Sequence, residues 1–212
     1  MSTVKSLAHE TFLKLRDDIV AGRIRPNERL IAGDLAEELQ VSRTPVREAL
    51  QLLEAEDLIV GVKRGYVVRE HTRDEIVEIY EVRAALEGMA ARIVAEAADQ
   101  AQVARIEPLG AHQDAAASRD RRDNLVDLNT AFHAAIIDAS GNARLARINR
   151  SNSQHFFNYR IAALYTDEEA VAAVRGHAAI INALRLNDAD AAERAARLHV
   201  IDGLNATLAK LR

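Results

Sequence analysis

The sequence lacks cysteine and tryptophan, and its 212 residues include only three prolines and nine glycines. The absence of cysteine excludes disulfides, thiolate metal sites and a cysteine nucleophile. No apolar run approaches the ~20 residues that a membrane-spanning helix needs, and the charged N-terminal segment 1–15 has no signal-peptide pattern. We therefore expect a cytoplasmic protein with no membrane partner. Few helix breakers and abundant alanine predict a mainly α-helical fold.

The charge balance excludes one class of nucleic-acid-binding protein. The chain carries 28 basic against 32 acidic residues, a net charge of −4, so it does not coat nucleic acid by bulk attraction. A local positive site is still compatible with this balance, because the position of the charges decides attraction at short range. Residues 1–70 hold 11 basic and 12 acidic residues, so DNA binding by this region would depend on geometry and on pairing of two copies.

The first 70 residues show three helical patterns followed by a strand pair. Apolar residues recur at helical spacing at about 7–21, at about 33–40 and from Thr44 onward. Thr44 is the expected N-cap of the third helix, with Pro45 as its first residue. Two β-branched runs within 58–68 flank a glycine turn and predict a hairpin. This order is typical of a winged helix-turn-helix, which we assign to residues 1–70.

Basic side chains gather at two places in this predicted domain. Arg43 and Arg47 lie at the start of the third helix, where the helix dipole disfavours cations unless an external anion is present. Gln51 shares the exposed face with Arg47, and either side chain could reach a base edge in the major groove. Lys63 and Arg64 at the hairpin tip would meet phosphate or the minor groove. Exposed arginines can simply solvate a helix, but the combination favours double-stranded DNA.

The motif from Val41 to Leu50, Val-Ser-Arg-Thr-Pro-Val-Arg-Glu-Ala-Leu, carries a specific resemblance. Together with the segment 53–58 and the Arg64-Gly65 pair, it resembles the GntR family of bacterial transcription regulators. The resemblance implies operator contacts by four residues: Arg43, Thr44, Arg47 and Gly65. The sequence departs from the family pattern at two places. Gln40 replaces a turn glycine, and the segment 31–33, Ile-Ala-Gly, lacks the usual polar cap and arginine.

Residues 71–212 show only helical patterns, which predict an antiparallel bundle. Thr72 and Thr166 each open a capping box, three residues before a glutamate. Gly141 can end a helix, and Pro108 is expected to kink or split one. The six expected helices span about 73–98, 100–118, 124–139, 143–163, 167–186 and 189–210.

Three histidines in this region lie on the apolar faces of three predicted helices. His133 follows Asn129 by one turn, whereas His177 and His199 belong to later helices. Inward histidines on three helices can converge on a divalent metal, for which neutral imidazole is a good ligand. The alternative is a set of hydrogen-bonded core histidines.

The same residues resemble the FCD class of C-terminal domains within the GntR family, in its shorter six-helix version. In that class an acid or amide lies four residues before a Phe-His pair, and two further histidines follow on later helices. The resemblance then covers roughly residues 7–210 and implies a metal, zinc or nickel, held by Asn129, His133, His177 and His199. Asparagine in place of aspartate removes a charge attraction and lowers the expected metal affinity.

Arg83 lies in the middle of the apolar stripe of the first bundle helix. A charge at such a position is costly unless it is paired. One interpretation is an internal ion pair with Glu87, one turn away. The other is a clamp that holds an effector carboxylate. The resemblance implies that Arg83, with a contribution from Arg160, binds a small carboxylate or a sugar acid beside the metal.

Together these features predict a homodimeric repressor whose affinity for operator DNA changes when a small organic acid binds in the C-terminal domain. Two alternatives retain DNA binding: the metal is itself the signal, or the metal is purely structural. A third alternative is a three-histidine metal-dependent hydrolase. We do not expect an enzyme, because the sequence has no His-Glu-x-x-His helix and no general base beside the histidines.

Overall fold

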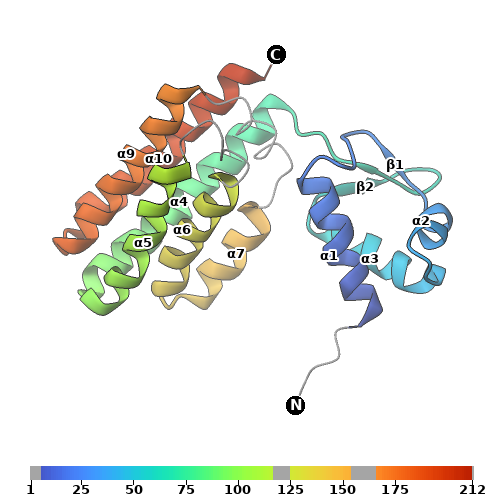
Figure 1. The fold of residues 1–212 in the computed structure, drawn as a ribbon, viewed down its shortest axis with the longest axis horizontal. Helices are drawn as coiled ribbons and strands as arrows, with labels where there is room; N and C mark the ends of the chain where they lie inside the picture. Colours follow the sequence, from blue (N-terminus) through green and yellow to red (C-terminus); the bar gives the residue numbers. More distant parts are fainter. Residues whose placement is uncertain (1–5, 117–124, 154–165, 212) are drawn as a thin grey trace. The chain divides into compact units, whose positions relative to one another are not determined.

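The computed structural model describes residues 6–116, 125–153 and 166–211. They form two compact units that divide after His71. Figure 1 shows that helices dominate both units and that the described strands belong to the first. The predicted fold class, a winged helix-turn-helix followed by an antiparallel helical bundle, is confirmed.

The first unit contains three helices and a small sheet. Strand β3 lies between β1 and β2 and is antiparallel to both, with Val60 opposite Val67 in the β2–β3 hairpin. The hairpin was expected, whereas β1 was not, because two residues give no strand pattern. The elements are α1 (Leu7–Val20), β1 (Arg29–Leu30), α2 (Ala32–Glu38), α3 (Arg43–Ala55), β2 (Ile59–Gly61) and β3 (Tyr66–Val68).

Helix α3 begins one residue before the predicted N-cap. Ser42 is the N-cap, with extended backbone angles of φ −74° and ψ 163°, and Arg43 is the first helical residue. The prediction of Thr44 as the cap is therefore wrong. Pro45 is still tolerated, because the first backbone N–H groups of a helix have no intrahelical acceptor. The earlier start places Arg43 inside the first turn.

One face of α3 forms the centre of the first unit's core. Val46, Ala49, Leu50 and Leu53 are completely buried, as their helical spacing predicts. They pack in one cluster with apolar residues of α1, among them Ile19. Burial of this face leaves the opposite face of α3 exposed.

The turn before α3 has the conformation that glycine prefers, although glycine is absent there. Gln40 has φ 56°, and the N–H of Val41 donates to the carbonyl of Ala36 at 3.0 Å. A left-handed conformation costs a residue with a Cβ about 1–2 kcal/mol. The helix-turn-helix therefore retains its turn at a small expense in stability.

The described residues of the second unit form helices at the predicted places, whereas the predicted helical positions 117–118, 124 and 154–163 lie outside the described residues. Helix α4 packs against α10, α6 and α7, while α9 packs against α10 and α5. The helices are α4 (Arg73–Ala97), α5 (Gln100–Ala116), α6 (Leu125–Ala139), α7 (Ala143–Ser153), α9 (Asp167–Arg185) and α10 (Ala189–Lys210).

Both predicted capping boxes are present. The backbone N–H of Thr72 donates to Glu75 Oε2 at 2.8 Å, and Thr72 Oγ1 accepts from the N–H of Glu75 at 3.3 Å. Thr166 and Glu169 form the same pair of bonds. Pro108 does not split a helix, since α5 runs continuously through it. Proline removes one backbone donor there.

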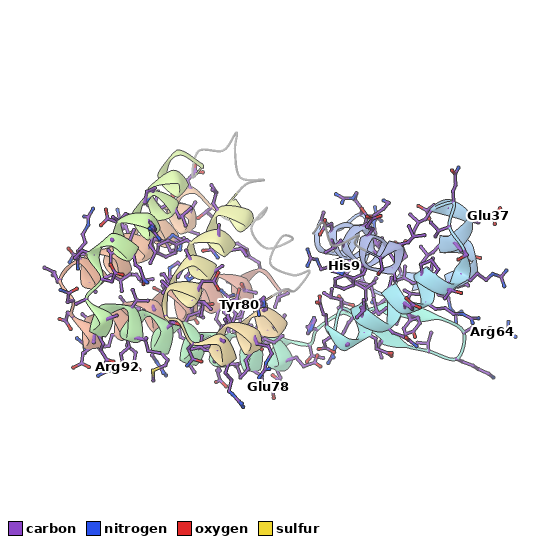
Figure 2. All side chains as sticks on the ribbon, turned by 90° about the horizontal axis from the view of Figure 1, so that it is seen from below. His9, Glu37, Arg64, Glu78, Tyr80 and Arg92 are labelled. Carbon is purple, nitrogen blue, oxygen red and sulfur yellow. The ribbon has the colours of Figure 1, made fainter. Side chains whose placement is uncertain are left out.

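The core of the second unit is made of alanine, isoleucine and a few larger side chains. Phe132, Ile180 and Leu184 are fully buried. The hydroxyl groups of Tyr80 and Thr207 lie 3.0 Å apart and link α4 to α10, and Figure 2 shows Tyr80 among the bundle helices. Within the described ranges, no helix is both long and apolar enough to cross a membrane.

Candidate nucleic-acid interface and metal centre

The start of α2, the exposed face of α3 and the hairpin line a groove of about 560 Å³. The groove collects five of the residues predicted from the sequence: Arg43, Arg47, Gln51, Arg64 and Gly65. Two predicted residues, Thr44 and Lys63, are exposed but do not line it. Figure 2 shows Arg64 at the outer end of the hairpin.

Three arginines, Arg43, Arg47 and Arg64, line this groove together with one acid, Asp34. Arg43, Arg47 and Lys63 form no ion pair with any residue that the structure describes. Ser42 makes no side-chain capping bond, and the first turn of α3 contains no acid. The positive end of the helix dipole and two guanidinium groups are therefore available to an anion.

Backbone contacts hold the groove in shape. Arg29 of β1 donates from Nε to the carbonyl oxygen of Arg64 at 2.9 Å and so braces the hairpin tip. Gly65 has φ 89°, and a Cβ there would collide with the carbonyl of Leu30. A Cβ on Gly33 would lie 3.7 Å from the guanidinium of Arg43. The brace was not predicted, because Arg29 and Arg64 are 35 positions apart and share no local pattern.

In the bundle, the three predicted histidines meet. His133 of α6, His177 of α9 and His199 of α10 each offer a ring nitrogen, and these atoms lie within 4.8 Å of one another. The Nε2 atoms of His133 and His177 are 3.3 Å apart. Imidazole nitrogens at this separation can share a single cation, and three of them form the open donor set of many zinc sites.

The environment of the cluster keeps two of its rings neutral. Burial, together with the neighbouring His199 and His133, lowers the pKa of His177 well below its usual value. Burial, followed by the effect of His133, lowers the pKa of His199 to about 3. Neutral imidazole is the form that binds metal, so these two histidines are in the ligand state at neutral pH.

A glycine makes room for the third ring. A Cβ on Gly176 of α9 would collide with Nδ1 of His199. The absence of a side chain therefore lets α10 bring His199 against α9, beside His177. Sequence reasoning missed Gly176, because a glycine inside a helix gives no sign of which distant side chain packs on it.

Two other residues, Asn129 and Arg160, were also predicted for this site. Asn129 lies on α6 one turn before His133 and is half-buried. Its side chain forms no hydrogen bond with the part of the chain that the structure describes. Arg160 lies outside the described residues.

Arg83 forms the ion pair that one interpretation of the sequence predicted. Its Nε lies 3.1 Å from Oε1 of Glu87, and its guanidinium lies 4.9 Å from the ring centroid of Tyr80. Oε2 of Glu87 lies 2.8 Å from Nδ1 of His133. Burial opposes ionisation of Glu87, but its interactions with His133 and Arg83 outweigh it and lower the pKa of Glu87. The effector role of Arg83 stays a prediction.

Comparison with protein families identifies both units. Residues 7–68 match the family described as "Bacterial regulatory proteins, gntR family", and residues 78–202 match the FCD domain. The second match alone covers more than half of the 212 residues. The matched ranges follow the two compact units, with α4 beginning just before the FCD match.

Curated relatives match most of the chain. The HTH-type transcriptional regulator YdhC of Bacillus subtilis is 28% identical over 88% of this chain and 84% of its own length. A protein of Paenarthrobacter nicotinovorans named "Probable D-xylose utilization operon transcriptional repressor" is 30% identical over 90% of this chain and 84% of its own length.

Two solved structures share the fold. Escherichia coli McbR/YncC superposes with a TM-score of 0.82 at 21% identity, covering 99% of this chain and all of the other. A GntR regulator of Rhodococcus sp. RHA1 superposes with a TM-score of 0.78 at 24% identity, covering 98% of this chain and all of the other. The family matches and the relatives show that this chain belongs to the GntR family, in its FCD class, a family of transcriptional regulators rather than of enzymes.

Proposed function

We propose that this regulator is a cytoplasmic repressor whose operator affinity is set by a small organic acid bound in the FCD domain beside a divalent metal. Repression is supported by relatives that are named as repressors, among them the protein from Paenarthrobacter nicotinovorans. The observation that carries the proposal is the convergence of three histidine nitrogens from α6, α9 and α10 within 4.8 Å.

The donor set fits zinc or nickel. The pKa values of His177 and His199 are low chiefly because the first ring is buried and the second is partly buried, so neither must lose a proton at neutral pH before it binds a metal. His133 is also buried, and the half-buried amide of Asn129 offers an oxygen one turn away. These donors leave at least one coordination position for an acid, to which the metal supplies Lewis-acid attraction.

Arg83 gives the same region of the bundle a second anchor for an anion. Its side chain is 11% exposed and is held by Glu87 and by the ring of Tyr80. A carboxylate of a small acid or sugar acid could pair with the guanidinium while its other end reaches the histidines. This pairing is stronger in a buried site than in water.

At the other unit, the groove supports reading of double-stranded DNA. Arg47 and Gln51 would face base edges, and Arg43, Thr44, Lys63 and Arg64 would meet the backbone. A near-neutral domain gains affinity when two copies bind two half-sites, so we propose a homodimer on a pseudo-palindromic operator. The acid regulates only if it binds the DNA-free arrangement more tightly than the DNA-bound one.

Fluorescence anisotropy with a duplex from the region upstream of the protein's own gene tests this proposal. The zinc- or nickel-loaded protein should bind the duplex, and one or more of a panel of small carboxylates and sugar acids should weaken binding. His177→Ala should bind the duplex as wild type does but lose the response to the acid. A full response in His177→Ala would exclude the histidine cluster as the sensing site.

A further inference from the structure

Glu87 is the buried acid that contacts the histidine cluster, and the proposed ligand set does not include it. It is 3% exposed and extends from α4 toward α6. Its Oε1 faces Arg83 at 3.1 Å, and its Oε2 faces Nδ1 of His133 at 2.8 Å. Within the described residues, Oε2 accepts no hydrogen bond of standard geometry. Its close polar contact is the one with the imidazole of His133.

We propose that Glu87 is the positioning residue of the metal site, because it fixes which nitrogen of His133 faces the cluster. A neutral imidazole carries one N–H and one lone pair. A carboxylate beside Nδ1 favours the proton at that atom. The lone pair is then at Nε2, the atom that lies 3.3 Å from Nε2 of His177. A histidine oriented in this way by a carboxylate is a stronger metal ligand.

Charge supports the same assignment. Three neutral imidazoles and the amide of Asn129 bring no negative charge to a divalent cation. Glu87 supplies one, which Arg83 partly offsets, although the Glu87 oxygens are not part of the group of ligand atoms that lie within 4.8 Å of one another. It therefore acts through His133 and not as a ligand itself.

Arg83 completes the arrangement from the other side. It lies one turn before Glu87 on α4 and pairs with the carboxylate oxygen that His133 does not use. The pair restricts rotation of the carboxylate, so Oε2 stays directed at the imidazole. Arg83 is thereby connected to the metal site through two contacts, and an acid that draws Arg83 away from Glu87 would also release His133. This inference rests on the proposed metal site.

Nitrogen-15 NMR of the wild-type full chain, kept with a chelator at pH 8, tests the tautomer without any variant. We expect His133 to carry its proton on Nδ1, with Nε2 unprotonated. A proton on Nε2, alone or together with one on Nδ1, would overturn the proposal. This experiment is independent of metal binding and of DNA.

The second experiment measures zinc affinity by competition with a chromophoric chelator. Glu87→Gln can still accept a hydrogen bond but loses the charge, and we expect zinc to bind about 10–100-fold more weakly. Glu87→Asp retains the charge but falls short of His133, so we expect a loss in the same range. Glu107→Gln is the matched control, because Glu107 also pairs with an arginine, Arg185, at 2.6 and 2.8 Å, and is not part of the cluster.

The outcomes separate this inference from the proposed function. If wild type itself binds no zinc or nickel, the proposed metal site is wrong. If wild type binds zinc and both folded Glu87 variants bind it equally well, only the role of Glu87 is wrong. Far-UV circular dichroism establishes that each variant is folded. If neither variant folds, the tautomer measured in wild type decides.

Discussion

The two units of this regulator build their sites in opposite ways. The groove of the first unit draws on residues between Ile31 and Tyr66, and its arginines are exposed and without ion pairs among the described residues. The cluster of the second unit joins side chains 44 positions apart, such as His133 and His177, and buries them in a connected network. The comparison indicates that the exposed arginines of the first site are available to a charged partner, whereas packing already holds the histidines of the second site together.

Removal of the metal should give the largest difference between the units. A metal present at 1,000 times its dissociation constant stabilises the folded state by about 4 kcal/mol. Chelation should therefore lower the melting temperature of the bundle by about 10–15 °C, as measured by calorimetry. His177→Ala should melt at the same temperature with and without chelator. If the chelator leaves the melting temperature of wild type unchanged, the bundle holds no stabilising metal.

The next largest effect is expected at Gly65. An alanine there would adopt an unfavourable φ and collide with the carbonyl of Leu30, which together should cost about 3 kcal/mol. The loss should appear in denaturant unfolding of the first unit, and zinc affinity of the bundle should be unchanged. Gly141→Ala is the matched control, since Gly141 also has positive φ but no atom within 4 Å of an added Cβ. Equal losses at the two sites would exclude the clash.

Arg47→Ala should weaken binding to the upstream duplex by about 2 kcal/mol, roughly 30-fold, because one base-reading contact is lost. Arg25→Ala removes an equally exposed arginine of the same unit that does not line the groove. It should leave affinity nearly unchanged in the same anisotropy titration. If the two variants bind alike, the groove is not the reading surface and the contrast between the units fails.

Gln40→Gly should give the smallest effect and the opposite sign. Glycine adopts the left-handed conformation at φ 56° without strain, but it adds entropy to the unfolded chain. The free energy of unfolding should therefore rise by about 0.5–1 kcal/mol. Urea unfolding of the first unit measures this gain. Asn27, which also has positive φ, serves as a comparison, because asparagine tolerates that region better and Asn27→Gly should gain less.

Much of the fold follows from local signals in the sequence. The capping boxes at Thr72 and Thr166, and the turn at Gly65, are each set by a few neighbouring residues, and all three are present. Errors arose where neighbouring signals compete. Ser42 and Thr44 are both residue types that suit an N-cap, and the helix begins after Ser42 although the Ser42 side chain makes no capping bond.

The site in the bundle was predictable only in part. The helical spacing of His177 and His199 identified inward-facing rings, and resemblance grouped them with His133. The contact between Glu87 and His133 has no local signature, because it depends on how α4 packs against α6. The space that Gly176 provides for His199 is nonlocal in the same way.

The most direct test of the difference between the units is the metal content of the full chain. Wild type dialysed against zinc or nickel, and then against metal-free buffer, should retain one ion per chain in elemental analysis, while His177→Ala retains none. Arg47→Ala should retain the ion as wild type does. Wild type that holds no ion, or a His177→Ala variant that holds as much as wild type, would contradict a metal centre at the three histidines.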